Sequence, residues 1–399
     1  MKKLALFLIL IISLSFLSGC LDPVSLDEYG YVVTIGADRG EEKKYFITFA
    51  LQRGLSEPGT EAEGGAQLLT CEGDSLDEAV KEAESRMSCT LNFSRTNFFI
   101  FSREVAEAGD IEELLSISFD SMKIRPFAAV VVSDCEAYRF IGGMSANNDA
   151  NVNKLQSGLF LDARRAGSSQ VMSVSLLMEA AGGGAFDYSA ALGDEDGDII
   201  TDTAQKTSQN EGEDPLEDIS AGEKAGGLKA FVKGTALFSG WRMTGELTRE
   251  ESIYLDMVCG SFTEGTVDLP LGEGSVTLMV KLTKVKREVR FENGRPKADV
   301  FIRLEAGVHE APRELSEAMF DEWLRDTAPG LLEAACESVF IKCRDAKSDA
   351  MRFGTDAVKR FSSYEQWLRY DWKRAYEGTE ASFTFVLVNT DKTAGGGML

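Results

Sequence analysis

Cys20 is the residue whose type and position point most directly to a chemical role. It follows Leu17, Ser18 and Gly19, at the end of an apolar run that begins after two lysines. A leucine, two small residues and a cysteine form the bacterial lipobox, in which diacylglycerol alkylates the thiol and cleavage then frees the cysteine as the new N-terminus. We therefore expect residues 1–19 to be a cleaved signal peptide and Cys20 to carry a covalent lipid.

The apolar run from Leu4 to Phe16 is too short to span a bilayer, which needs about 20 residues. The alternatives are an ordinary secretory signal with a chance cysteine and a buried N-terminal helix. The basic start, the core length and the small-residue exit together favour the lipobox. Because two acyl chains give stable anchoring, we expect a folded body tethered by lipid to the outer face of a membrane.

Little else in the sequence predicts catalysis or metal binding. The single histidine, His309, has no nucleophile elbow near it, and no phosphate-binding or dinucleotide-binding glycine motif is present. Asp194, Asp196 and Asp198 resemble the start of a calcium loop, but isoleucine and glutamine occupy its sixth and twelfth positions. We predict no enzyme activity, no metal and no cofactor beyond the diacylglycerol on Cys20.

Six cysteines remain after Cys20. They form no C-x-x-C pair, and their spacings fit no small disulfide framework. Buried free thiols are therefore favoured over metal or redox chemistry, while disulfide pairing stays open. The six are Cys71, Cys89, Cys135, Cys259, Cys336 and Cys343.

An aromatic stretch near the C-terminus has two interpretations. Trp367, Tyr370 and Trp372 lie within nine residues that begin at Tyr364. Large aromatic residues at such spacing commonly belong to a core, but exposed Trp, Tyr and Arg are also what partner interfaces prefer. The sequence leaves both a core role and a partner interface open for these three residues.

Overall charge restricts the partners. The chain carries a formal charge of -23, which would repel nucleic acid and anionic lipid alike. A chain of 399 residues with 44% apolar residues is expected to form two or three domains with substantial cores. We therefore predict no nucleic-acid partner and assign membrane attachment to the lipid.

The sequence after the signal peptide predicts a mixture of strands and helices. Alternating apolar residues predict a hairpin over residues 31–51, a capping box at Ser75 predicts a helix over 76–88, and residues 98–101 and 128–132 read as buried strands. Twelve acids between Phe186 and Gly226 predict a flexible segment. The predicted divisions are a signal peptide (1–19), an N-terminal mixed α/β domain (20–135), a helical part of a middle domain (136–185), an acidic flexible loop or linker (186–227) and a C-terminal α+β domain (228–392).

The C-terminal part predicts a long helix packed on an antiparallel sheet. Asn293-Gly294 between two alternating runs is a strong signal for a two-residue hairpin. Pro312 is expected to begin the helix, which Pro329 should kink or interrupt. The fold class that follows is α+β, with about three domains built from mainly antiparallel sheets and helices.

The order of these features resembles the Ger(x)C family of spore germination lipoproteins. Its matching fragments include Ser18-Gly19-Cys20, Tyr31–Asp38, Phe98–Ala106, Lys233–Phe238, Gly245-Glu246-Leu247, Ser348-Asp349, Phe353-Gly354, Trp367 and Trp372. The resemblance implies a non-enzymatic, lipid-anchored subunit of a nutrient germinant receptor. Such a subunit works beside two integral membrane subunits at the outer face of the spore inner membrane. Cys20 is the one functional residue that the resemblance carries over.

Two other functions remain open at this point. A substrate-binding lipoprotein of a membrane transporter would have two α/β lobes with parallel sheets and a ligand cleft, whereas the hairpins here favour antiparallel pairing. A surface hydrolase would have to manage with one histidine, although paired carboxylates remain conceivable.

Overall fold

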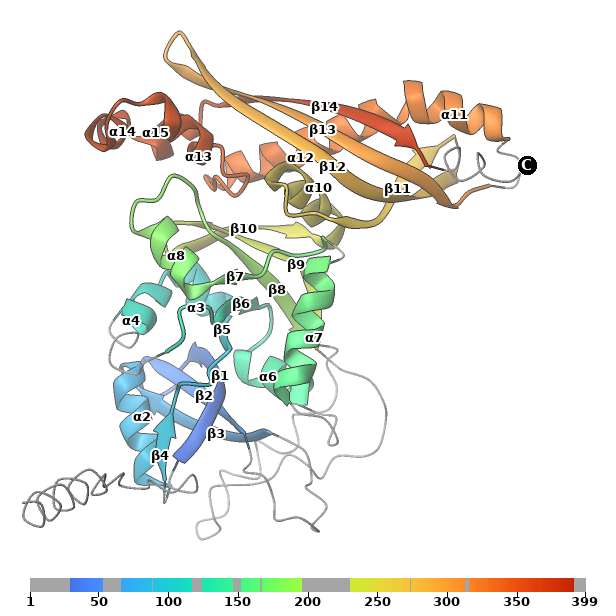
Figure 1. The fold of residues 1–399 in the computed structure, drawn as a ribbon. Coiled ribbons are helices and arrows are strands. Elements are labelled where there is room, and N and C mark those ends of the chain that lie inside the picture. Colours follow the sequence, from blue (N-terminus) through green and yellow to red (C-terminus); the bar gives the residue numbers. More distant parts are fainter. Residues whose placement is uncertain are drawn as a thin grey trace, which may run out of the picture.

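The computed structural model describes residues 29–52, 66–87, 89–116, 124–145, 152–165, 167–195, 230–272, 274–312 and 316–390. Two sheets dominate these residues and lie at opposite ends of the molecule (Figure 1). The first sheet comes from the chain between Tyr29 and Thr248, and the second from Glu264 to Asn389. Cys20 and residues 17–19 lie outside the described residues.

The first sheet has a parallel centre and antiparallel flanks. Its order is β10-β9-β8-β6-β5-β1-β2-β3, with β4 beside β1 and β7 beside β6. Strands β8, β6, β5 and β1 run parallel, whereas β2 with β3 and β9 with β10 add antiparallel pairs at the two sides. The strands are β1 (Tyr29–Arg39), β2 (Tyr45–Gln52), β3 (Ala66–Gly73), β4 (Thr90–Asn92), β5 (Phe98–Ser102), β6 (Ala129–Ser133), β7 (Met172–Ser173), β8 (Ser189–Glu195), β9 (Ala230–Ser239) and β10 (Arg242–Thr248). The predicted hairpin and both buried strands are confirmed.

Helices cover both faces of this sheet. On one face Val105, Ile111 and Leu177 join the core cluster that contains Phe99 and Val130, and on the other face Phe140 packs with the cluster around Ile100. The helices are α2 (Leu76–Ser85), α3 (Arg103–Ala108), α4 (Ile111–Ser116), α6 (Ala137–Ser145), α7 (Val152–Arg165) and α8 (Val174–Ala181). The predicted helix over 76–88 is confirmed as α2, whose first turn Ser75 caps by accepting a hydrogen bond from the Glu78 amide.

Strand β8 corrects the predicted start of the acidic loop. The sequence placed that start at Phe186, but Ser189–Glu195 pairs with both β6 and β9. Ala190, Ala191 and Leu192 are fully buried, because small residues fit between the helices and the two neighbouring strands. Residues 196–229 lie outside the described part of the chain. The first sheet runs across residues 135 and 228, and the domain divisions drawn there remain a prediction.

The second sheet is mainly antiparallel. Its order is β11-β12-β13-β14, in which β11, β12 and β13 pair antiparallel and β14 runs parallel to β13. The strands are β11 (Glu264–Leu271), β12 (Gly274–Glu292), β13 (Arg295–Glu310) and β14 (Glu380–Asn389). The predicted turn is confirmed, since Asn293 and Gly294 have φ of 52° and 81° and join β12 to β13.

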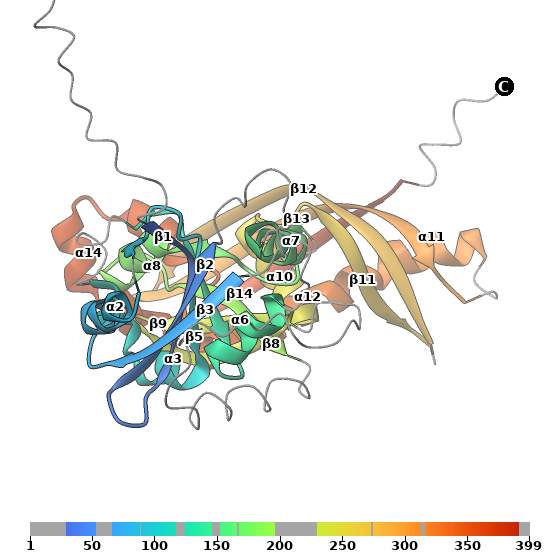
Figure 2. The same ribbon diagram turned by 90° about the horizontal axis from the view of Figure 1, so that it is seen from below.

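Helices from the C-terminal part pack between and beside the sheets. Ser316 caps α11, so the helix expected from Pro312 begins at Glu317, where a side-chain cap is available. Pro329 interrupts it as predicted and lies in the first turn of α12, where its missing N–H costs nothing. Together, α11 and the second sheet extend past the first sheet on one side (Figure 2). The helices are α10 (Arg249–Cys259), α11 (Glu317–Asp326), α12 (Ala328–Asp345), α13 (Gly354–Ala357), the 3-10 helix η3 (Val358–Arg360), α14 (Tyr364–Tyr370) and α15 (Trp372–Tyr376).

Candidate functional site

The two sheets meet at a loop that we call the junction loop, residues 346–353, which connects α12 to α13. Lys347 and Arg352 both have left-handed backbone conformations, with φ of 55° and 60°. The Ser348 amide donates to the Cys343 carbonyl at 2.9 Å, which turns the chain back over the end of α12. Non-glycine residues at positive φ are strained, so this loop depends on its surroundings to hold its shape.

Asp349 is the centre of the junction loop and is completely buried. Its carboxylate accepts hydrogen bonds from the Phe353 amide at 2.8 Å, the Gly354 amide at 2.7 Å and the Trp372 indole nitrogen at 2.9 Å. Burial raises the pKa of this carboxyl to about 7, while the amide and indole donors oppose that rise. These bonds tie the loop, the start of α13 and α15 to one buried group.

The backbone of Asp349 reaches across to the first sheet. Its amide donates to the Asp187 carboxylate at 3.0 Å, and the Asp187 amide donates to the Asp349 carbonyl at 3.3 Å. Asp187 directly precedes the stretch that leads into β8, and its carboxylate also accepts from the Gly240 amide, in the β9–β10 turn, at 3.1 Å. Lys373 of α15 lies 3.5 Å from the same carboxylate. Two distant parts of the chain are therefore joined here by one main-chain hydrogen bond and by one from an amide to a side-chain carboxylate.

Gly354 allows the close approach of these two parts. A Cβ atom at this position would lie 2.1 Å from the Ala185 carbonyl oxygen and 2.6 Å from the Trp372 indole nitrogen. Any other residue would have to push the first-sheet segment away from α13. The close contact between α13 and the segment before β8 therefore requires glycine at position 354.

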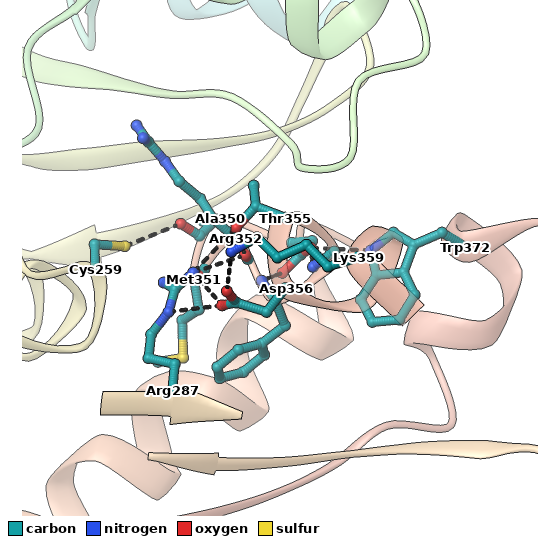
Figure 3. A network of polar contacts seen from close by, with 12 residues as sticks. Cys259, Arg287, Ala350, Met351, Arg352, Thr355, Asp356, Lys359 and Trp372 are labelled. Atoms are coloured by element: carbon teal, nitrogen blue, oxygen red, sulfur yellow. Dashed lines mark hydrogen bonds and ion pairs between the residues drawn. The ribbon is translucent and has the colours of Figure 1, made fainter. Parts of the chain in front are cut away.

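Arg287 of β12 secures the other side of the junction loop. It donates to the Asp356 carboxylate at 2.6 and 2.9 Å, to the Met351 carbonyl at 2.8 Å and to the Arg352 carbonyl at 3.1 Å (Figure 3). The guanidinium and its partner carboxylate are both mostly buried, at 15% and 16% exposure. A planar guanidinium can donate to several acceptors at once, so this one side chain can hold two main-chain carbonyls of the loop in place.

A second buried carboxyl links the two sheets beside the junction loop. Asp256 of α10 accepts hydrogen bonds from the Gln170 side-chain amide at 2.8 Å and from the Ser261 hydroxyl at 2.6 Å. Gln170 in turn accepts from Ser189 of β8 at 2.8 Å. Burial raises the pKa of Asp256 to about 7, against the lowering effect of its two donors.

The aromatic residues singled out in the sequence lie mostly inside the protein. Trp367 and Trp372 are 3% and 6% exposed, and their rings stack with centroids 5.6 Å apart. Both rings therefore belong to the C-terminal hydrophobic core, and a partner interface at this stretch stays a prediction. Tyr370 is half-buried, and its hydroxyl donates to the Gly294 carbonyl at 3.2 Å in the β12–β13 turn.

Sequence reasoning missed three residues that build this site. Asp187, Asp256 and Arg287 gave no motif, because each has partners that come close only after folding, such as Asp349, Gln170 and Met351, which lie 162, 86 and 64 residues away. Asp187 was counted as one acid of the predicted flexible loop. Ser348-Asp349 and Phe353-Gly354 did appear among the fragments of the family resemblance, and these are the residues at the centre of the site.

Among the described residues, the site brings together no set of side chains arranged for catalysis. The polar groups of Asp349, Asp187 and Arg287 are engaged with main-chain atoms or with neighbouring side chains. Within the described ranges, no three metal-ligating side chains gather in one place, and His309 is exposed. Each of the six described cysteines is a free thiol, and burial raises the pKa of several of them, Cys259 to about 11. The arrangement is suited to fixing two units relative to one another.

Comparison with known proteins gives the family. Residues 22–180 match the spore germination protein N-terminal domain, and residues 233–388 match the C-terminal region described as spore germination B3/GerAC-like. The chain belongs to the GerAC-like family of spore germination proteins. The junction loop, α13 and Trp372 lie within the second matched region. The predicted family and the prediction of a germination protein are confirmed.

Two individual proteins extend this result. Spore germination protein KC of Bacillus subtilis (strain 168) is 21% identical over 394 residues, which cover 94% of this chain and 92% of that protein. The crystal structure of the GerBC protein is similar with a TM-score of 0.53 at 12% identity, covering 89% of this chain and 97% of the other. At that identity the structural likeness concerns the fold, and the predicted α+β class is confirmed.

Proposed function

We propose that this protein is a non-enzymatic, lipid-anchored subunit of a spore nutrient germinant receptor. The observation that carries the proposal is the match of both halves of the chain to spore germination families. In this role the protein works beside integral membrane subunits on the outer face of the spore inner membrane. The junction of the two sheets supports a scaffold or coupling role, since it commits its buried polar groups to holding the units together.

The proposed anchor is diacylglycerol on Cys20. Its support lies in the sequence: two lysines, a short apolar core and then Leu17, Ser18 and Gly19 directly before the cysteine. Two acyl chains provide stable attachment at about 0.8 kcal/mol per buried methylene group.

A separate observation concerns membrane spans. Among the helices in the described residues, none combines the length and apolar character needed to cross a bilayer.

Replacing Cys20 by alanine tests the anchor. The variant should move from the membrane fraction to the soluble fraction, because the thiol that accepts the lipid is gone. Cell fractionation followed by immunoblotting measures this, in a strain that lacks the other receptor subunits. Cys89→Ala is the matched control and should stay with the membrane. Membrane retention of the Cys20 variant would contradict lipid anchoring.

Deletion of the gene tests the receptor role. Spores should form normally but lose their response to particular nutrients, measured as the fall in optical density and the release of dipicolinate. The deletion is best made in a strain without other nutrient receptors, so that redundancy does not mask the effect. Normal germination combined with loss of solute uptake in growing cells would instead favour a transporter-associated binding protein.

A further inference from the structure

Part of the second sheet has a free edge. Strand β11 pairs with β12 only from Gly274 to Lys281, whereas β12 continues to Glu292. Beyond Leu282, whose amide donates to the Thr263 carbonyl at 2.9 Å, the strand has β13 on one side and no described strand on the other. We call the stretch 283–287 the β12 edge.

The direction of the backbone groups along this edge follows from the pairing. The register between Lys284 and Glu292 is regular, and the Val289 carbonyl points away from β13 because it accepts a bond from the Arg360 guanidinium at 3.1 Å. Groups on alternate residues point the same way. The amides and carbonyls of Val285 and Arg287 therefore also point outward, and they have no hydrogen-bond partner among the described residues. These are the groups to which an added strand would bind.

A groove runs beside the β12 edge. It is an open groove of about 580 Å³, with Thr263 on one side and Leu282 and Val285 on the other, and the ion pair of Arg287 and Asp356 also lines it. Alternate side chains of an added strand would point to the two faces of the sheet. Those on the core face would enter this groove, and those on the opposite face would lie beside the exposed side chains of β12. Strand addition of this kind combines main-chain bonds with pockets for alternate residues.

Charge indicates which partner fits. Lys281, Lys284 and Lys286 are exposed on the outer face of β12 and form no ion pair within the described residues, in a chain with a formal charge of -23. An added strand would place its outward side chains directly beside Lys284 and Lys286. Opposite charges at such cross-strand positions are favourable and like charges are not.

These lysines should also oppose pairing between the edges of two copies of this chain, because like charges would meet. Lysines and bulges are common protection against edge pairing, and the register of β12 shifts between Leu282 and Lys284. Protection alone gives no reason for a groove beside the edge that is open to a partner's side chains. The free edge, the groove and the lysines together indicate that this edge pairs with a partner strand of opposite charge and not with another copy of the chain.

We propose that the β12 edge binds an extended segment of a partner protein in which acidic and apolar residues alternate. The apolar residues enter the groove beside Leu282 and Val285, and the acidic residues pair with Lys284 and Lys286. This surface is independent of the lipid anchor, and its failure would leave the proposed receptor role untouched.

A blocked synthetic peptide of alternating valine and glutamate is the probe. The full chain should bind it in fluorescence anisotropy, and hydrogen exchange should show new protection of the Val285 and Arg287 amides. Replacing both edge lysines by glutamate should weaken binding by about tenfold. The matched control is Lys81→Glu, a charge reversal at an exposed lysine of α2, which should leave binding unchanged.

A second peptide separates strand addition from simple charge attraction. Replacing the central valine by proline preserves the charge but removes a main-chain donor, and it should abolish the amide protection. Absence of binding, equal binding of the proline peptide or protection located away from the β12 edge would each overturn the proposal. Self-association of the chain through this edge in sedimentation would also overturn it.

Discussion

Two buried carboxyl groups, Asp256 and Asp349, lie where the units meet. Each accepts hydrogen bonds from several donors, yet burial raises the pKa of both to about 7. A buried carboxyl binds its proton more tightly than an exposed one, because the charged form loses its hydration. The stability of the junction should therefore depend on pH close to neutrality.

Asp256→Asn tests this dependence. In the unfolded chain Asp256 ionises near 3.8, and in the folded protein near 7, so the folded state retains a proton that the unfolded state has lost between these values. Stability should fall as pH rises from about 4 to about 7. The asparagine keeps both hydrogen bonds to its carbonyl oxygen but cannot ionise. Between about pH 5 and pH 8, the variant should lose less stability than wild type by roughly 1–3 kcal/mol.

Urea unfolding at the two pH values makes this measurement. Asp162→Asn, at an exposed position on α7, is the matched control and should reproduce the wild-type pH dependence. An unchanged dependence in the Asp256 variant would mean that this carboxyl is already ionised in the folded protein at the lower pH.

At the scale of elements, the junction loop and α13 join structures that the chain order keeps apart. The start of α13 contacts the segment before β8, α15 contacts the turn between β9 and β10, and β12 holds the loop through Arg287. One short stretch thus fixes the positions of both sheets. Substitutions there should affect the whole molecule more than equivalent changes within either core.

Gly354→Ala tests this at the point of closest approach. The added methyl group would meet the Ala185 carbonyl, so the variant should lose about 1–3 kcal/mol of stability, as overpacked contacts do. Gly330→Ala on α12 is the matched control, because nothing lies within 4 Å of a Cβ there. That change should be neutral or stabilising, since alanine favours helix. Chemical unfolding compares the two, and equal stabilities would contradict the contact.

The sequence predicted those elements whose signals are local. Alternation, the Ser75 cap and the Asn293-Gly294 turn each depend on a few neighbouring residues, and they placed β1, β2, α2 and the β12–β13 hairpin correctly. Strand β8 was missed because its buried residues are small and acids follow them directly.

The candidate site was predictable only in part. Asp349 and Gly354 could be noticed through the family resemblance, but their partners Asp187 and Ala185 come from a segment about 160 residues earlier in the chain. No local pattern records such a contact. The burial of Trp367 and Trp372 was undecidable for the same reason, since tertiary packing determines whether an aromatic stretch faces the core or a partner.

The whole molecule is elongated, with the first residues of β1 at the end away from the second sheet (Figure 1). Eight residues lie between Cys20 and Tyr29, and a chain of that length extends at most about 30 Å. A lipid on Cys20 would therefore keep α2 and β4 near the membrane and hold the second sheet away from it.

Energy transfer to a membrane-embedded acceptor tests this orientation. A fluorescent amino acid at position 81, on α2, should transfer more strongly than one at position 295, beside the β12–β13 turn. The lipidated protein in vesicles provides the sample, and the Cys20→Ala variant should show neither signal. Stronger transfer from position 295 would mean that the molecule lies in the opposite orientation.

The long β12–β13 hairpin has a mechanical consequence through Arg287. This side chain grips the Met351 and Arg352 carbonyls, and the same loop is bonded to Asp187 beside β8. A partner that pulled on the hairpin would therefore transmit part of the force to the first sheet through the Arg287 guanidinium and the Asp187 carboxylate. With a lipid on Cys20, force applied to the hairpin would reach the first sheet, which would lie on the membrane side of the molecule.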